Sequence, residues 1–304
     1  MAIWRQALSA AMLLVAACSP PEAPPRAPSP RPPRRAPTAA DITSFEDGPG
    51  ARAPAPGGAP GCGDTEVGFD AWLEGFRRRA PEEGLSPATV ASALAGVTYD
   101  PEVVRLDRTQ RAFKLSLEEL VAKRVTPSRV RRGKALLRAH APLLARVEAR
   151  FGVPPEVVVA IWGLETDFGA NTGSMSSLRA LATLAYDCRR APRFRAELVA
   201  ALRLVQRGDL TAAEMVGAWA GELGQTQFLP SSYEAFGVDF DGDGRVDLLR
   251  STPDVLASTA AYLQGHGWRP REPYGEGTAN FKALEGWNSS ELYRRTIVVF
   301  ASRL

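Results

Sequence analysis

The stretch that most constrains the fold is PPEVVVAIWGLETDFG, residues 154–169, which predicts a buried helix carrying one acid. Pro155 suits the first helical position, because its fixed φ is already helical and its missing N–H is not needed there. Large apolar residues between positions 157 and 164 spread around the whole circumference, so this helix has to lie in a core. We expect Gly169 to end it as a left-handed cap.

Glu165 lies near the end of this helix, where a core position would deprive its carboxylate of water. Desolvation disfavours the charged form, so the pKa of Glu165 should rise. An acid that stays protonated near neutral pH can donate a proton to a substrate. The alternative is a structural glutamate paired with an arginine, since ion pairs also place acids in cores. The helix alone does not decide between the two.

Residues 1–17 are short and apolar with Arg5 near the start, which predicts a secretory signal too short to span a bilayer. The segment ends in Val-Ala-Ala-Cys18, which resembles a bacterial lipobox, where the cysteine becomes the lipidated N-terminus. Ser19 follows, and in that resemblance it favours the outer membrane. We therefore expect a periplasmic protein of a Gram-negative bacterium, anchored to the outer membrane by lipid. An ordinary signal peptide with an accidental cysteine is the alternative.

Residues 18–61 are predicted to be a linker after the lipidated cysteine, because 13 of the 25 prolines lie between positions 19 and 61. Such a segment buries too little apolar surface to offset its ordering entropy, and prolines keep it extended. The formal net charge of the whole chain is only +3, so its basic pI is no argument for nucleic-acid binding. We assign the folded, catalytic domain to residues 62–304.

Two cysteines, Cys62 and Cys188, remain if Cys18 is lipidated. An even pair in an exported protein favours a disulfide, which would pin the start of the folded part onto its body. Two free buried thiols are the alternative.

The folded part is predicted to be mainly α, with no internal repeat and no alternation of strands and helices. Ser86 and Pro87 have the order of an N-cap and a first helical residue. Ile297–Val299 is β-branched and ambiguous. Apolar residues at helical spacing predict helices over residues 69–79, 113–123, 128–148, 177–186, 197–206, 212–220 and 255–263.

Several kinds of catalytic site are excluded by composition. The two histidines, His140 and His266, have no partner at metal-ligand spacing, which argues against zinc hydrolysis and against a Ser-His-Asp triad. There is no glycine-rich phosphate loop. Carboxylate chemistry is what remains.

A polar loop, GELGQTQFLPSSY at residues 221–233, mixes amides and hydroxyls with aromatic and apolar side chains. Polar donors beside flat apolar faces suit a sugar, which has hydroxyl edges and C–H faces. Taken alone, the loop is better explained as a connection with capping serines.

A second loop, DFDGDGRVD at residues 239–247, is close to an EF-hand calcium loop. Alternate aspartates repel one another unless a cation lies between them. Arg250 replaces the bidentate glutamate expected at the twelfth position, and Asp254 is the nearest acid that can substitute for it. An empty acidic turn is the alternative to a structural Ca²⁺ site. The candidate ligands are Asp239, Asp241, Asp243, the carbonyl of Arg245, Asp247 and Asp254.

These stretches, in this order and spacing, resemble the B-type membrane-bound lytic murein transglycosylases. IWGLETDFG, WAGELGQTQFLPSSY, VDFDGDGRVDL and AAYLQGHGW carry the resemblance, which covers residues 62–304. It implies a lysozyme-like helical core with additional helical segments and the EF-hand-like loop. It also implies cleavage of the β-1,4 bond between N-acetylmuramic acid and N-acetylglucosamine in peptidoglycan, without water or cofactor, leaving a 1,6-anhydro ring. We expect a monomer whose partner is the glycan strand.

The resemblance also assigns site residues. Glu165 matches the single catalytic acid and base. Ala218 stands where many members have a serine, and Glu222 where some have an alanine. The positions that match sugar-binding residues are Gln227, Phe228, Tyr262, Trp287, Asn288 and Tyr293, with Trp287 standing where tyrosine is usual.

Two alternative functions stay open. A lysozyme-like hydrolase would need a second carboxylate, and Glu222 is the candidate because Asp167, two residues after Glu165, points elsewhere on a helix. A non-catalytic peptidoglycan-binding lipoprotein would keep the groove, yet it has little need of a costly buried acid.

Overall fold

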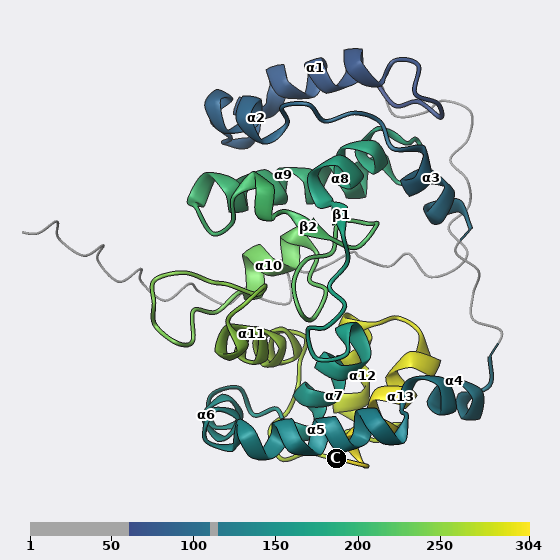
Figure 1. Ribbon diagram of the computed structural model, residues 1–304, viewed down its shortest axis with the longest axis vertical. Coiled ribbons are helices and arrows are strands. Elements are labelled where there is room, and N and C mark those ends of the chain that lie inside the picture. Colours follow the sequence, from purple (N-terminus) through teal and green to yellow (C-terminus); the bar gives the residue numbers. More distant parts are fainter. Residues whose placement is uncertain (1–60, 110–114) are drawn as a thin grey trace, which may run out of the picture. The chain divides into compact units, whose positions relative to one another are not determined.

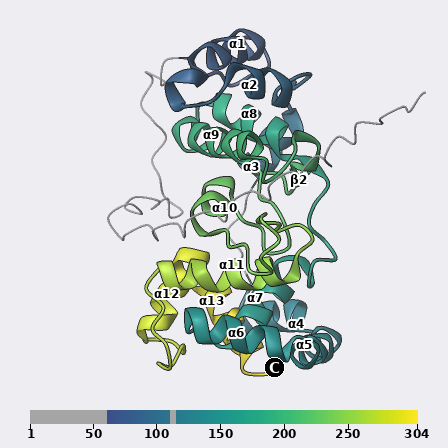
Figure 2. The same cartoon turned by 90° about the vertical axis from the view of Figure 1, so that its left-hand side faces the viewer.

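The helix expected around Glu165 forms as α7 (Pro155–Thr166) in the computed structural model, which describes residues 61–109 and 115–304 (Figure 1). Every residue from Val157 to Leu164 is buried. Four helices pack around α7, which explains why it is apolar on all sides. They are α5 (Pro127–Ala139), α6 (Ala141–Phe151), α11 (Thr252–Gly265) and α13 (Glu291–Ala301), and both views show α7 among them (Figure 1 and Figure 2).

The end of α7 differs from the prediction. Asp167, with φ 54°, is the left-handed C-cap, and Phe168 and Gly169 continue with positive φ values of 58° and 82°. The N–H of Asp167 bonds to the carbonyl of Gly163 at 3.1 Å. A short polar side chain tolerates the left-handed conformation better than most, so the cap lies at Asp167, two residues before the glycine.

A second group of helices is built around the pair α8 (Ser177–Tyr186) and α9 (Ala191–Arg207), both largely buried. α1 (Phe69–Arg79), the 3-10 turn η2 (Ala80–Glu83), α2 (Pro87–Ala93) and α3 (Pro101–Arg108) precede this pair in the chain, and α1, α2 and α3 pack against it. Ser86 caps α2, accepting the N–H of Thr89 at 3.1 Å, and Pro87 is its first residue, as predicted.

Two of the helices expected from periodicity are wrong. The segment 128–148 divides at His140 into α5 and α6, because Pro142 has no N–H to donate to the preceding turn. The segment 212–220 contains only the 3-10 turn η3 (Ala212–Glu214), closed by a capping box with Thr211. The chain then becomes extended as β2 (Val216–Gly217), which pairs antiparallel with β1 (Met175–Ser176).

The rest of the described chain is helical. α4 (Leu117–Arg124) corresponds to the helix predicted over residues 113–123 and ends one residue later than predicted. α10 (Pro230–Phe236) lies at the end of the polar loop. Ser251 caps α11 and accepts the N–H of Asp254 at 3.3 Å. α12 (Ala279–Trp287) precedes α13, which contains the ambiguous Ile297–Val299. The fold is mainly α, as the sequence predicts.

The described part begins with a covalent tie. Cys62 and Cys188 form a disulfide bond, and the N–H of Gly63 beside it donates to the carbonyl of Tyr186 at 3.1 Å. The bond joins residues 126 positions apart, so the start of α1 is fixed to the junction of α8 and α9. The predicted signal peptide, Cys18 and nearly all of the predicted linker lie outside the described residues.

Buried acids strengthen the same junction. Asp107, at the end of α3, is only 2% exposed and accepts from both Arg189 and Arg190. Asp187 is equally buried and binds Arg108 at 2.7 Å. Within residues 61–109 and 115–304, no helix is long and apolar enough to cross a membrane.

Candidate active site

Glu165 is the one residue between Val157 and Thr166 on α7 that is not buried. The apolar helix therefore opens to its surroundings at a single polar position. Neighbouring helices enclose the backbone that presents this carboxyl, and their close packing holds the carboxyl in a fixed position.

Two side chains from the C-terminal helices donate to one oxygen of this carboxyl. Trp287 Nε1 lies 2.9 Å from Glu165 Oε1, and the hydroxyl of Tyr293 lies 2.8 Å from the same atom. Within the described residues, Oε2 has no hydrogen-bond partner. In this hydrogen-bond pattern Trp287 and Tyr293 both donate to Oε1, which places the proton of the neutral acid on Oε2.

The electrostatics of Glu165 favour the neutral acid. Burial raises its pKa, the hydrogen bonds from Trp287 and Tyr293 oppose this rise, and the net shift is upward. The positive charge of Arg124 also lowers the pKa, while the negative charge of Glu222 adds to the rise. Tyr293 has its own pKa raised well above the usual value by burial and by Glu165, so it stays a neutral donor. The upward shift of the Glu165 pKa agrees with the shift predicted from the sequence.

The short connection between α12 and α13 fixes both donors. Trp287 is the last residue of α12, and Tyr293 lies in the first turn of α13. Arg294, 9% exposed, donates to the carbonyl of Ser289 at 3.1 Å and so ties the connection to α13. Asn288 Oδ1 accepts the N–H of Ser290 at 2.9 Å, which gives this predicted sugar-binding residue a role in shaping the turn.

Aromatic side chains pack against the ring of Trp287. The rings of Phe228 and Trp287 meet edge to face with centroids 5.6 Å apart, and Tyr262 meets Trp287 at 5.1 Å. Tyr262 also stacks on His266 at 4.1 Å and donates its hydroxyl to the carbonyl of Gly286 at 2.7 Å. Phe228 is only 3% exposed, so its main contribution is to hold neighbouring rings in place.

Gln227 closes the polar loop around the site. Its backbone has φ 57°, and its Nε2 donates to the carbonyls of Gly224 at 2.9 Å and Thr172 at 3.2 Å. The side chain thus joins the polar loop to the segment that follows α7.

An ion pair between Glu165 and an arginine was the structural alternative to a catalytic role. The ion pairs with arginine are formed by Asp167 instead. Arg129 Nε lies 2.9 Å from Asp167 Oδ1, and Arg132 lies 3.2 Å from Oδ2. No ion pair reaches Glu165 among the described residues. The sequence analysis did not anticipate that Trp287 and Tyr293, 122 and 128 positions away, would be its partners.

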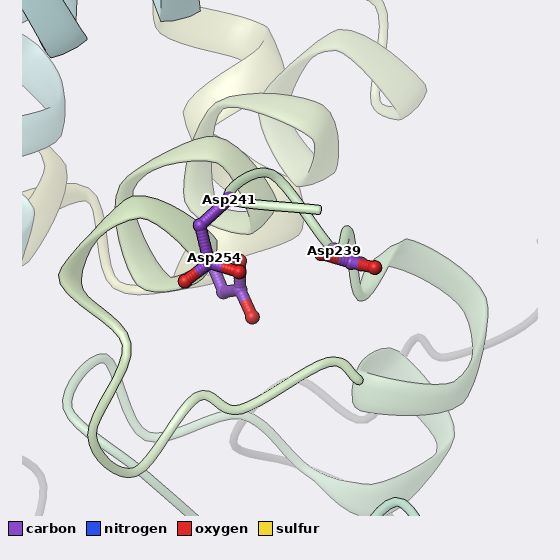
Figure 3. Close-up of side chains that lie close together, drawn as sticks. All are labelled: Asp239, Asp241 and Asp254. Carbon is purple, nitrogen blue, oxygen red and sulfur yellow. The ribbon is translucent and has the colours of Figure 1, made fainter. Parts of the chain in front are cut away.

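The acidic loop brings together three of its candidate ligands. Carboxylate oxygens of Asp239, Asp241 and Asp254 lie within 4.8 Å of one another (Figure 3). Asp254 is fully buried on α11, and burial raises its pKa to about 6, although it accepts backbone N–H groups from Phe240 and Asp247. Three converging carboxylates, one of them buried, are a donor set that suits a hard cation such as Ca²⁺.

The other candidate ligands are not part of this group of three carboxylates. Asp243 Oδ1 accepts the N–H of Arg245 at 2.8 Å, and Asp247 pairs with Arg250 at 3.2 Å. Arg250, at the position where an EF-hand has its glutamate, also binds Glu214 at 2.6 Å. Asp239 and Asp241 accept similar local hydrogen bonds, so the roles of Asp243, the carbonyl of Arg245 and Asp247 as ligands stay predictions.

Comparison with known proteins decides the family. A family profile described as "Transglycosylase SLT domain" matches residues 68–278, well over half of the chain. The chain belongs to this transglycosylase SLT domain family. The resemblance found in the sequence is thereby confirmed, and the matched residues lie inside the expected domain of residues 62–304.

Lytic transglycosylases of two organisms are similar to the chain in sequence or in structure. "Membrane-bound lytic murein transglycosylase B" of Escherichia coli (strain K12) is 38% identical over 145 residues, which is 47% of this chain and 40% of the relative. The match therefore spans less than half of that relative's length. SltB3 from Pseudomonas aeruginosa, solved in complex with NAG-anhNAM-pentapeptide, has a TM-score of 0.72 and 34% identity over 77% of this chain and 78% of its own. The Escherichia coli lytic transglycosylase Slt35 in complex with calcium has a TM-score of 0.68 and 25% identity, over 76% and 91%.

Within this SLT-family site, Glu222 is a second acid near Glu165. Its Oε2 accepts the N–H of Ala220 at 3.2 Å, and its own carbonyl accepts the N–H of Ala218 at 3.0 Å. Burial raises the pKa of Glu222 as well. Ala218 has no hydroxyl, so the serine that many family members were expected to have here contributes nothing in this chain.

Proposed function

We propose that this SLT-family protein is a lytic transglycosylase that cleaves the β-1,4 bond between N-acetylmuramic acid and N-acetylglucosamine in peptidoglycan, without water. The observation that carries the proposal is the Glu165 carboxyl, which has a raised pKa and two neutral donors on one oxygen. The other oxygen is left to exchange a proton with a substrate. The complex of the relative SltB3 with an anhydro-muramyl ligand supports the same reaction class.

The arrangement supplies one acid and one base from the same group. Glu165 Oε2 donates its proton to the glycosidic oxygen, and the bond from that oxygen to the muramyl C1 breaks with its electron pair going to the oxygen. Trp287 and Tyr293 then stabilise the carboxylate through Oε1. The carboxylate takes the proton of the muramyl C6 hydroxyl, whose oxygen bonds to C1. Protons balance, and no water enters.

The sugar is proposed to contact the residues that face Glu165. Trp287 offers an aromatic edge beside the acid, and Tyr293 offers a hydroxyl. Gln227, Phe228, Tyr262 and Asn288 act mainly by holding this surface in shape, since their polar atoms or rings already contact protein groups.

A hydrolase using Glu222 is the second candidate, because the charge of Glu222 is close enough to raise the pKa of Glu165. A hydrolytic nucleophile or base has to be ionised, however, and burial raises the pKa of Glu222 too. This favours the transglycosylase.

Mass spectrometry of the products from purified peptidoglycan tests the proposal. The chain carrying Cys18→Ala, which prevents lipidation, should release muropeptides one water lighter than hydrolysis products. Glu165→Gln should keep a cooperative thermal transition and still bind sacculi, while activity falls by at least about a hundredfold. Reducing-end products would support the hydrolase. Binding without any products would support a non-catalytic peptidoglycan-binding protein.

We also propose that Asp239, Asp241 and Asp254 hold a structural Ca²⁺. The convergence of three carboxylates supports this, and so does the calcium complex of the relative Slt35. The ion would add stability to the loop before α11 and would take no part in bond cleavage.

We further propose that the protein acts as a monomer in the periplasm, lipid-anchored to the outer membrane through Cys18. The lipobox-like sequence supports the anchor, as does the word "membrane-bound" in the name of the Escherichia coli relative. Labelled palmitate should be incorporated into the chain in a Gram-negative host and absent from Cys18→Ser. Equal labelling of both would contradict the anchor.

A further inference from the structure

We propose that Gln225 is a positioning residue that couples the acidic loop, residues 239–247, to the end of α7, where Glu165 lies. The coupling runs through Leu248 and Leu249, which directly follow the loop. The inference rests on the proposed function for its consequence in catalysis. Its structural part concerns only the contacts of one amide. Gln225 lies in the polar loop of residues 221–233, and both ends of its side-chain amide are engaged by protein groups.

Toward the catalytic helix, Gln225 accepts two hydrogen bonds. Trp162 Nε1 donates to its Oε1 at 3.0 Å, and Thr166 Oγ1 donates to its main-chain carbonyl at 2.5 Å. Trp162 precedes Glu165 by three positions on α7, and Thr166 directly follows it. Thr166 also accepts the N–H of Gly169 at 2.8 Å, so one hydroxyl ties the end of α7 to Gln225.

Toward the acidic loop, Gln225 donates two hydrogen bonds. Its main-chain N–H bonds to the carbonyl of Leu248 at 2.9 Å, and its Nε2 bonds to the carbonyl of Leu249 at 3.0 Å. These carbonyls directly follow Asp247, whose own N–H donates to the buried carboxylate of Asp254 at 2.8 Å. A change at the three-carboxylate group therefore reaches Gln225 through two consecutive hydrogen bonds.

Glycines on both sides allow this close contact. A Cβ added to Gly169 would lie 2.5 Å from Gln225 Oε1, and one added to Gly224 would lie 2.4 Å from the carbonyl oxygen of Leu248. Both glycines have positive φ, 82° and 75°. The backbone is thus shaped to clamp one amide between α7 and the acidic loop.

The residue type matters because glutamine has an acceptor and a donor on one planar group. Glutamate keeps an acceptor for Trp162 but places an acceptor against the carbonyl of Leu249. Gln225→Glu should therefore retain the side-chain bond from Trp162 and break the side-chain bond to Leu249, while the main-chain bonds with Thr166 and Leu248 remain. Gln225→Met keeps the length and removes both side-chain bonds.

The test follows the indole N–H resonance of Trp162 by NMR, assigned with Trp162→Phe, while CaCl₂ is added to the chain carrying Cys18→Ala. In the unmodified protein, Ca²⁺ should shift this resonance and raise the melting temperature. In Gln225→Glu, the melting temperature should still rise, and the resonance should no longer respond. Gln264→Glu, on an exposed position of α11, is the matched control and should behave as the unmodified protein. Gln225→Met replaces Gln225→Glu if the latter shows no cooperative transition.

Activity gives a second readout. Gln225→Met should lower kcat about tenfold with KM unchanged, because the position of Glu165 is affected and the sugar contacts are not. A Trp162 resonance that responds equally in Gln225→Glu, or that fails to respond in the unmodified protein, would overturn the proposal. Since the NMR readout needs no substrate, the coupling and the proposed function can fail separately.

Discussion

Replacing Tyr293 by phenylalanine removes one of the two donors to Glu165 Oε1 and keeps the ring that packs at the start of α13. The lost contact is a 2.8 Å hydrogen bond whose strength grows as Glu165 gives up its proton and becomes charged. A hydrogen bond to a charged group contributes about 1.5–3 kcal/mol. Because 1.4 kcal/mol is about a factor of ten in rate, kcat should fall roughly ten- to a hundredfold.

The pH dependence gives the prediction its sign. In the proposed mechanism Glu165 reacts in its protonated form, so kcat/KM should fall as pH rises through the pKa of Glu165. Tyr293 lowers that pKa in the folded protein, and its loss should raise it. Tyr293→Phe should therefore be slower at its optimum, yet its alkaline limb should lie at higher pH than that of the unmodified protein.

The assay is the initial rate of release of anhydro-muropeptides across pH, scored by mass spectrometry. Tyr186→Phe is the control, because it also loses a donating hydroxyl, in this case one bonded to the carbonyl of Val67, away from Glu165. The control should leave the alkaline limb in place. An alkaline limb of Tyr293→Phe that moves to lower pH, or an unchanged kcat, would refute the role of Tyr293 in stabilising the carboxylate.

Three further predictions concern stability. Chelation by EDTA should lower the melting temperature of the unmodified protein and not that of Asp241→Asn, since a ligand bound only to the native state stabilises it; equal melting curves with and without EDTA would contradict the Ca²⁺ site. Asp107→Asn should lower the free energy of unfolding in urea by about 3 kcal/mol, because it leaves two arginines without their buried acid; a loss below about 1 kcal/mol would contradict this. The Cys62–Cys188 bond closes a loop of more than a hundred residues and so restricts the unfolded chain. Reducing it should lower the free energy of unfolding by roughly 4–5 kcal/mol. An unchanged urea midpoint would contradict a stabilising effect of the bond on the unfolded-state entropy.

Local patterns in the sequence predicted the parts of the fold that depend on local physics. The core helix around Glu165 followed from apolar residues on every side and a proline at its start. The cap at Ser86 followed from a short polar side chain directly before a proline. The two wrong helices failed where another constraint prevailed: the missing N–H of Pro142 in one case, and pairing with β1 in the other.

The partners of Glu165 could not be predicted from the same patterns. Trp287 and Tyr293 come from helices more than a hundred positions later, and only the packing of α13 against α7 brings them to the acid. The resemblance marked both as sugar-binding positions, and the structure adds that they donate to the carboxyl of Glu165. The acidic loop was predicted from spacing, and tertiary contact brings Asp254, on α11, together with Asp239 and Asp241.

The disulfide between Cys62 and Cys188 also determines how the protein bears mechanical load. Any pull exerted through the residues before Cys62 passes across the sulfur–sulfur bond to the junction of α8 and α9, where Asp107 and Asp187 hold their arginines. α7 lies within the loop that this bond closes, whose ends are 126 positions apart. The disulfide is a shorter covalent path than the chain of this loop, so a pulling force passes through the bond and not through α7. Tension applied before Cys62 therefore bypasses α1, which lies inside the closed loop.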